Sequence, residues 1–187
     1  MNKYIKTLLY GANLWYLGEG MFGPLFAVFS ERIGGSILDI TWAWAIYLIV
    51  SGIMIMYIGR LSDKKFDKAN LMIAGYALNA LATLGYLFVT TQAQFFLIQI
   101  ILGVAAALAI PTWNALYAEY EDKGVEGGEW GLASGEAKIL TGIATILGGL
   151  IVTQFSFTAL FLIMGLIQVV ACIYQARILR FEKTRPL

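Results

Sequence analysis

Residues 93–118 read AQFFLIQIILGVAAALAIPTWNALYA, a run that contains no charged side chain. The core of a bilayer, about 30 Å thick, is crossed once by a helix of about 20 apolar residues. Five similar runs accompany it along the chain, at roughly 7–29, 38–58, 69–91, 131–153 and 155–176. The sequence therefore predicts an all-α membrane protein with six transmembrane helices.

The composition favours the same class and excludes several functions. Hydrophobic residues make up 59% of the chain and charged residues 13%, against about 25% charged in soluble domains. A net charge of +1 leaves no basic face for nucleic acid. The chain has no histidine and one cysteine, which removes His-dependent nucleophiles and most zinc sites. No glycine-rich phosphate loop with a lysine is present. We therefore expect no enzyme activity, no cofactor and no metal.

The basic residues predict the orientation in the membrane. They lie before the first run, between the second and third, between the fourth and fifth, and after the sixth. They are Lys3, Lys6, Arg60, Lys64, Lys65, Lys68, Lys123, Arg177, Arg180, Lys183 and Arg185. The opposite side carries only Arg32. Because basic residues collect on the cytoplasmic side, we expect a multi-pass protein of the inner or plasma membrane with both termini in the cytoplasm.

The chain also resembles itself at an offset of 90 residues. Glycines coincide at this offset: Gly52 with Gly142, Gly59 with Gly149, and Gly75 with Gly165. Each copy holds three spans, an odd number, so the copies have opposite orientations across the membrane. Inverted repeats of this kind are typical of secondary transporters, with the binding site at the midplane. We predict one bundle over residues 1–187, with repeats at about 7–91 and 93–176.

The loop between the second and third spans carries a motif. Its sequence, Gly59-Arg-Leu-Ser-Asp63-Lys-Lys-Phe-Asp-Lys68, resembles the loop signature of the major facilitator superfamily. That family's glycine and arginine are replaced here by Phe66 and Asp67. The fifth span resembles the family's glycine-rich helix, with glycines at intervals of seven on one narrow stripe: Gly128, Gly135, Gly142 and Gly149. The resemblance implies one major-facilitator-type bundle, with Gly59, Asp63 and Lys64 gating its conformation. The alternative for the loop charges is that they only fix topology.

A usual member of that family has twelve helices, so this chain resembles a half-size transporter. One bundle supplies half a cavity wall, and alternating access requires a second body. A twofold homodimer is the economical solution; a partner half from another gene, or a truncated chain, stays open. The resemblance places Asp63 against the partner's turn at residues 130–134, where a helix N-terminus favours an anion.

Charges within the spans indicate where coupling takes place, since each is costly unless paired or hydrated. Glu19 in the first span resembles the acid of proton-coupled sugar symporters, and Lys138 in the fifth span is within reach of it as a partner. The family's arginine in the fourth span is replaced here by Gln99. The alternative for Glu19 is a structural buried acid. Glu136 lies nearer the membrane edge, where hydration suffices.

Polar and aromatic residues on the first and fourth spans predict the solute site. They are Asn13, Tyr16, Gln99, Trp113 and Asn114. Amides and aromatic faces suit a sugar-like solute, whereas an acid beside aromatic rings equally suits a cationic amphipath. For Trp42, Trp44 and Trp130 we expect packing or interfacial anchoring, and for Asn79 and Gln168 we expect bonds between helices.

These observations predict a secondary transporter that is embedded in lipid and works as a homodimer by alternating access. We expect it to move a small polar, possibly sugar-like, solute together with protons. The alternatives are efflux of cationic amphipathic drugs and a non-transporting bundle that assembles another membrane protein.

Overall fold

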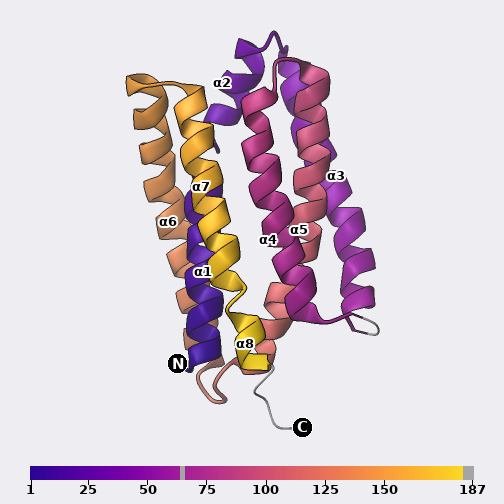
Figure 1. The fold of residues 1–187 in the computed structure, drawn as a ribbon, viewed down its shortest axis with the longest axis vertical. Coiled ribbons are helices and arrows are strands. Elements are labelled where there is room, and N and C mark those ends of the chain that lie inside the picture. Colours follow the sequence, from indigo (N-terminus) through magenta and orange to yellow (C-terminus); the bar gives the residue numbers. More distant parts are fainter. Residues whose placement is uncertain (64–65, 183–187) are drawn as a thin grey trace.

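The computed structural model describes residues 1–63 and 66–182, and over these ranges it contains helices and no strand. The helices are α1 (Lys3–Gly20), α2 (Leu25–Arg32), α3 (Ile37–Ser62), α4 (Lys68–Gly85), the 3₁₀ turn η1 (Tyr86–Phe88), α5 (Gln92–Tyr120), α6 (Glu126–Gln154), α7 (Phe157–Gln175) and α8 (Ile178–Glu182). The long helices stand side by side in one upright bundle, with the N-terminus and α8 at the same end (Figure 1).

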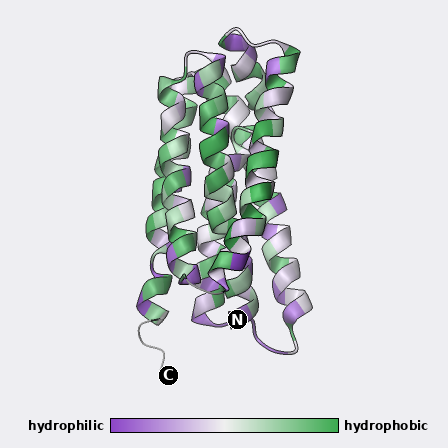
Figure 2. Ribbon diagram, turned by 90° about the vertical axis from the view of Figure 1, so that its right-hand side faces the viewer, coloured by the Kyte–Doolittle hydropathy of each residue, from purple (hydrophilic) through white to green (hydrophobic). Residues whose placement is uncertain are grey.

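Five stretches of the described chain are long and apolar enough to cross a membrane: Ile37–Ser62, Lys68–Phe88, Gln92–Tyr120, Glu126–Gln154 and Phe157–Phe181. Hydrophobic residues occupy the middle of the bundle, and hydrophilic residues gather mainly at its two ends (Figure 2). The first predicted span, 7–29, is divided between α1 and α2. At 1.5 Å per residue, the two pieces together are long enough for the sixth crossing, which agrees with the predicted six-helix bundle.

Side-chain caps explain where several helices begin. The Ser36 hydroxyl accepts from the Asp39 N–H while the Asp39 carboxylate accepts from the Ser36 N–H, and Thr91 and Gln94 repeat this arrangement at α5. Such reciprocal capping satisfies backbone donors that have no partner within the helix. The predicted spans begin within one or two residues of these caps.

The break between α1 and α2 has a local cause. Pro24 has no backbone N–H, so the carbonyl of Gly20, four residues earlier, lacks its helical donor. The Thr145 hydroxyl on α6 lies 3.1 Å from that oxygen. Gly148, one turn further along α6, lies so close to the Met21 carbonyl that an added Cβ would collide with it. Pro111 has no such effect, since α5 continues through it.

The packing of the helices follows the predicted inverted repeat. α3 packs on α5, and its repeat equivalent α6 packs on α1. In the same way α4 packs on α5, while its equivalent α7 packs on α1. α4 and α7 meet at the pseudo-twofold axis. One contact scheme therefore serves both repeats, as expected for a 3+3 bundle; the exact extents of the repeats and the single domain over 1–187 stay predictions.

The predicted start of the fifth span was wrong by about one turn. α6 begins at Glu126 rather than near residue 131, so the segment 130–134 lies inside the helix. The acids of the first turn, Glu126 and Glu129, explain the early start because they complement the positive end of the helix dipole. The predicted placement of a partner's Asp63 at a helix N-terminus therefore loses its stated reason, since two carboxylates already occupy that end.

Two apolar clusters fill the bundle, one toward each end. The cluster around α2 is strongly aromatic. Phe29 and Tyr86 each have ring contacts with Phe22, Phe95 and Phe161. The cluster at the other end joins the first turns of α1 to α4, α5 and α8.

Candidate solute site

Glu19 is held by two amides from helices that cross behind it. Asn79 on α4 donates from Nδ2 to Glu19 Oε1 at 2.9 Å, and Gln168 Nε2 on α7 lies 3.4 Å from the same oxygen. Gln168 also donates to the Trp15 carbonyl at 3.1 Å, which fixes its side chain against α1. A membrane-depth carboxylate is thus paired with neutral donors, which stabilise it less than a cation does.

The predicted ion pair between Glu19 and Lys138 is wrong. The ion pairs among the described residues join the Met1 amine to Asp122 and Lys68 to Glu119. Lys138 is exposed on α6, and no ion pair joins it to Glu19. Glu136, which we expected to be hydrated at the membrane edge, is half-buried and accepts a hydrogen bond of 2.6 Å from Asn13 Nδ2.

Glu19 lines a cavity of about 320 Å³ that is open on one side of the bundle. Its walls come from α1, α2, α3, η1, α5 and α6. The polar and aromatic side chains in them are Tyr16, Glu19, Phe22, Phe26, Trp44, Tyr47, Tyr86, Gln99 and Thr141. Gln99 is buried and donates to the Tyr86 hydroxyl at 2.8 Å. We refer to this space as the Glu19 cavity.

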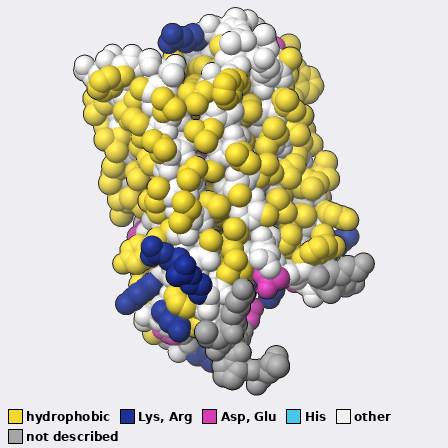
Figure 3. Space-filling model, viewed as in Figure 1, with side chains coloured by type: hydrophobic (Ala, Val, Ile, Leu, Met, Phe, Trp, Pro, Cys, Tyr) yellow, Lys and Arg dark blue, Asp and Glu magenta, His cyan; other side chains and the backbone are white. Residues whose placement is uncertain are grey.

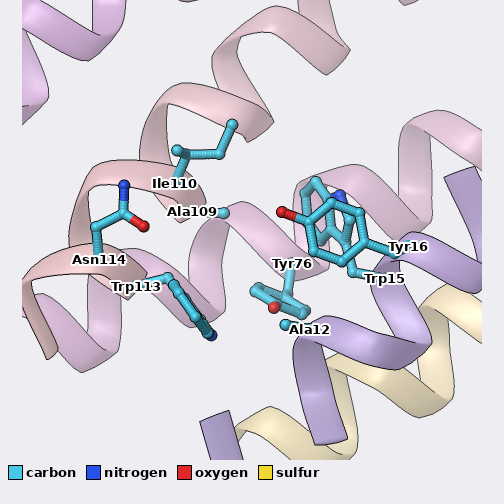
Figure 4. A pocket seen from close by; sticks show the side chains of 8 residues that line it. All are labelled: Ala12, Trp15, Tyr16, Tyr76, Ala109, Ile110, Trp113 and Asn114. Atoms are coloured by element: carbon cyan, nitrogen blue, oxygen red, sulfur yellow. The ribbon is translucent and has the colours of Figure 1, made fainter. Parts of the chain in front are cut away.

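Two smaller cavities continue along α1 and α5. In the first, of about 40 Å³, Asn114, Trp113 and Ile110 of α5 face Tyr16 and Trp15 of α1 (Figure 4). The second, of about 110 Å³, adds Asn13, Trp130 and Ser134 to the same wall. Tyr16 lines all three spaces, and 41% of its surface is exposed. A solute that moves from one of these cavities to the next would therefore stay next to Tyr16.

All five residues predicted to bind solute line at least one of the three cavities: Asn13, Tyr16, Gln99, Trp113 and Asn114. They do not form one cluster, because Gln99 lies in the Glu19 cavity whereas Trp113 and Asn114 line the smaller spaces. The Asn13 side-chain amide donates a hydrogen bond to Glu136, and the Trp113 indole N–H donates to the Leu8 carbonyl. Their role in binding stays a prediction.

Sequence reasoning missed several residues of the Glu19 cavity. Trp44, which we assigned to packing or anchoring, lines it together with Tyr47 and Tyr86. Asn79 and Gln168 were correctly expected to bond between helices, but their shared target is Glu19. The signal available in the sequence was their spacing of 89 residues, almost the repeat offset, which predicts equivalent positions on α4 and α7.

The predicted gating loop is only partly described. The space beside Gly59 is open: a Cβ added there would meet no described atom within 4 Å. Asp63 is exposed at the C-cap of α3. Lys64 lies outside the described residues. Lys68, from the end of the same loop, forms an ion pair of 3.2 Å with Glu119 at the end of α5. Within residues 1–63 and 66–182, no group of three or more His, Cys, Asp and Glu side chains could hold a metal ion.

The bundle and its one-sided polar wall define a membrane transporter rather than an enzyme. The model of the Major Facilitator Superfamily matches residues 8–186, and the chain belongs to that family. It is 24% identical over 157 residues to the uncharacterized MFS-type transporter MJ1560 of Methanocaldococcus jannaschii, covering 84% of this chain and 40% of that protein. It is 20% identical over 146 residues to the uncharacterized MFS-type transporter YitZ of Bacillus subtilis, covering 78% of this chain and 88% of that protein.

These matches confirm the predicted family resemblance and the predicted class of multi-pass membrane protein. They also confirm that the chain belongs to a family of transporters and not of enzymes. The two relatives differ in length. The chain spans less than half of the archaeal protein and most of the bacterial one.

Proposed function

We propose that this chain is one half of a homodimeric twelve-helix transporter that moves a small polar solute by alternating access. The observation that carries the proposal is the Glu19 cavity, which is bounded by one bundle and open on its remaining side. A solute held there would contact protein on one side only, and a second bundle supplies the missing wall. A cavity at the interface of two repeats or bundles is the usual site of secondary transporters.

The surface of the bundle supports a second copy as the partner. In the apolar membrane-spanning segment of each helix, only 17% of α3 and 11% of α6 are buried inside the bundle, against 50% of α5. Glycines lie on these exposed helices with nothing near them: Gly52, Gly59, Gly135, Gly142 and Gly149. Glycine faces allow helices to approach closely in a membrane. A twofold dimer brings α3 of each copy toward α6 of the other.

Weighing the protein tests the dimer directly. We would reconstitute it in lipid nanodiscs and determine its mass by native mass spectrometry. A dimer supports the proposal, and a strict monomer at every protein-to-lipid ratio contradicts it. Cross-linking of Asp63→Cys to Ser134→Cys then tests the predicted pairing of the loop with the partner's α6; a dimer that never cross-links there places the contact elsewhere.

We further propose that Glu19 couples transport to protons. The residue lies in the cavity wall, is held by two neutral amides, and has no cation paired with it among the described residues. An acid in that setting can exchange a proton with the cavity without breaking an ion pair. The inner or plasma membrane, with both termini in the cytoplasm, is the matching location that the basic residues favour.

A second candidate solute is a cationic amphipath. The supporting observation is the wall around Glu19, where six aromatic rings surround one carboxylate: Tyr16, Phe22, Phe26, Trp44, Tyr47 and Tyr86. Aromatic faces attract organic cations, and no described Lys or Arg forms an ion pair with the Glu19 carboxylate. Competition between a neutral sugar and a quaternary ammonium dye for binding to the reconstituted dimer separates the two solute classes.

A further inference from the structure

An open groove runs along the outside of the bundle between α1, α6 and α7, away from the Glu19 cavity. Its volume is about 410 Å³, and its lining is Tyr10, Asn13, Leu14, Leu17, Leu140 and Tyr174. From Tyr10 to Leu17 the groove follows α1 for about 10 Å. Apart from Asn13, the lining consists of leucines and tyrosine rings. We refer to this space as the α1–α7 groove.

Basic side chains stand at one end of this groove. Lys3, Lys6, Tyr10 and Leu17 recur at helical spacing and so share one face of α1. Arg177, in the turn between α7 and α8, follows Tyr174 by three residues, and its guanidinium carbon lies 4.5 Å from the Tyr174 ring centroid. Figure 3 shows Lys and Arg side chains gathered at the lower end of the bundle, beneath a largely hydrophobic surface.

Ring contacts join α1 to α7 and to α8 at this end. The Tyr10 and Tyr174 rings meet edge to face at 6.1 Å, and Tyr4 meets Phe181 in the same way at 5.5 Å. Lys6 and Arg177 lie in the turns between these two contacts. They therefore stand at a similar level, just beyond the tyrosine end of the groove.

No ion pair of the described side chains joins these cations to a carboxylate. The ion pairs among residues 1–63 and 66–182 involve Met1 and Lys68, and none involves Lys3, Lys6 or Arg177. All three are exposed. The carboxylate of Glu136 lies at the level of Asn13, about 10 Å along α1 from Lys6, and Asn13 donates to it. It lies beside the acyl-chain region rather than at the basic mouth.

We propose that the α1–α7 groove binds an anionic phospholipid from the leaflet at the end of α1 and α8. The phosphate is held by Lys6 and Arg177, with Lys3 behind them, and one acyl chain lies along Leu14, Leu17 and Leu140. Tyr10 and Tyr174 stand where the headgroup meets the hydrocarbon, the position that amphipathic rings favour. Basic pockets between transmembrane helices suit anionic headgroups for the same reason.

The test compares lipid retention in matched variants. The protein is placed in nanodiscs containing equal amounts of phosphatidylglycerol and phosphatidylcholine with identical chains, and the lipids retained on ejection are counted by native mass spectrometry. Each basic residue near an anionic headgroup contributes a factor of about five to its binding. We expect the double variant Lys6→Gln/Arg177→Gln to lower the ratio of retained phosphatidylglycerol to phosphatidylcholine at least about fivefold.

The control removes the same charge elsewhere at the same end. Arg60→Gln/Lys123→Gln changes two exposed cations that lie away from the groove and should leave the ratio unchanged. Leu140→Trp, which fills the groove, should reduce retention of both lipids while far-UV circular dichroism stays helical. Lys6→Arg/Arg177→Lys should keep the wild-type ratio. The proposal would be overturned if Lys6→Gln/Arg177→Gln left the lipid ratio unchanged. It would also be overturned if both double variants lowered the ratio equally, because the whole basic end would then attract anionic lipid without a defined site.

Discussion

The hydroxyl of Thr145 on α6 lies 3.1 Å from the carbonyl oxygen of Gly20, the backbone acceptor that Pro24 leaves without a helical donor. It also lies 2.9 Å from the carbonyl of Thr141 in its own helix, so one hydrogen serves two acceptors. Through this contact α6 holds the point where the first transmembrane segment breaks. The break is therefore a feature of two helices rather than of the proline alone.

Replacing Thr145 by valine removes the hydroxyl at nearly constant shape. We expect the variant to lose about 1–3 kcal/mol of unfolding free energy, the usual cost of leaving a buried acceptor unsatisfied. Denaturant unfolding in mild detergent measures this loss. Thr153→Val is the matched control, since its exposed hydroxyl bonds only within α6, to Gly149. If both variants unfold alike, the Gly20 contact contributes nothing.

Two neighbouring glycines of α6 should respond differently to alanine. At Gly148 a Cβ would collide with the Met21 backbone, whereas at Gly149 it would meet nothing within 4 Å. We expect Gly148→Ala to cost about 1–3 kcal/mol of stability through overpacking. Gly149→Ala should be neutral or slightly stabilising, because alanine is the better helix former. Thermal unfolding of the two single variants distinguishes them, and equal melting points would contradict this packing.

The proposed dimer predicts a separation between folding and association. Gly142→Leu adds a side chain to an open face of α6, so the bundle itself should keep its helicity and stability. We expect the variant to be largely monomeric by native mass spectrometry, because a close glycine contact tolerates no large side chain. Ala74→Leu, on the exposed surface of α4, should remain dimeric. A fully dimeric Gly142→Leu protein would exclude this face as the interface.

Proton coupling at Glu19 can be separated from solute binding. We expect Glu19→Gln in proteoliposomes to abolish solute-driven proton movement while solute exchange continues, because glutamine keeps the shape but carries no exchangeable acid proton. A pH-sensitive dye inside the vesicles reports the proton and a labelled solute reports the exchange. Glu136→Gln serves as the control acid on the neighbouring helix. Uphill transport that persists in Glu19→Gln would exclude the coupling role.

Asp122, in the loop between α5 and α6, predicts a pH dependence. The hydrogen bond from the Asn2 amide, followed by the contact with the Met1 amine, lowers the pKa of this carboxyl below its ordinary value of 3.8. A group with a lowered folded-state pKa contributes stability above its unfolded pKa and loses it as the pH falls through the folded value. We expect the melting temperature to fall more steeply below pH 4 in the wild type than in Asn2→Ala. If the melting temperatures of the two proteins fall in parallel with pH, the Asn2 contact does not lower the pKa of the Asp122 carboxyl.

The membrane spans and their order could be predicted from the sequence because apolar length and basic flanks depend only on local composition, whereas the division of the first span into α1 and α2 could not. The starts of α3 and α5 were equally accessible, since Ser36–Asp39 and Thr91–Gln94 are capping pairs visible in the sequence. The site was harder to predict. Helical spacing predicted that Asn13, Tyr16 and Asn114 lie along one wall, and all three line the same cavity. It could not show that Lys138 is exposed and forms no ion pair with Glu19.

The direction of a side chain on a uniformly apolar helix depends on which neighbours pack against it, and this information lies in other segments. The pairing of Lys138 with Glu19 was predicted from their similar depth in the membrane and from the expected contact between the first and fifth spans; α1 and α6 do pack together, but the two side chains form no ion pair. The amides that hold Glu19, from Asn79 and Gln168, belong to helices distant in the chain. Only the repeat offset linked them, and it gave no indication of their common target.

The unequal prolines make the two ends of the bundle mechanically different. α5 runs through Pro111 as one rod of 29 residues, whereas α2 is a segment of 8 residues joined to α1 by residues 21–24. Swivelling α2 requires a few dihedral angles to change, while tilting α5 displaces its entire length. In the alternating access that we propose, opening at the α2 end would therefore need only a local rotation, whereas opening at the opposite end would need a rigid-body displacement. Stiffening residues 21–24 would slow the first movement and leave the second untouched.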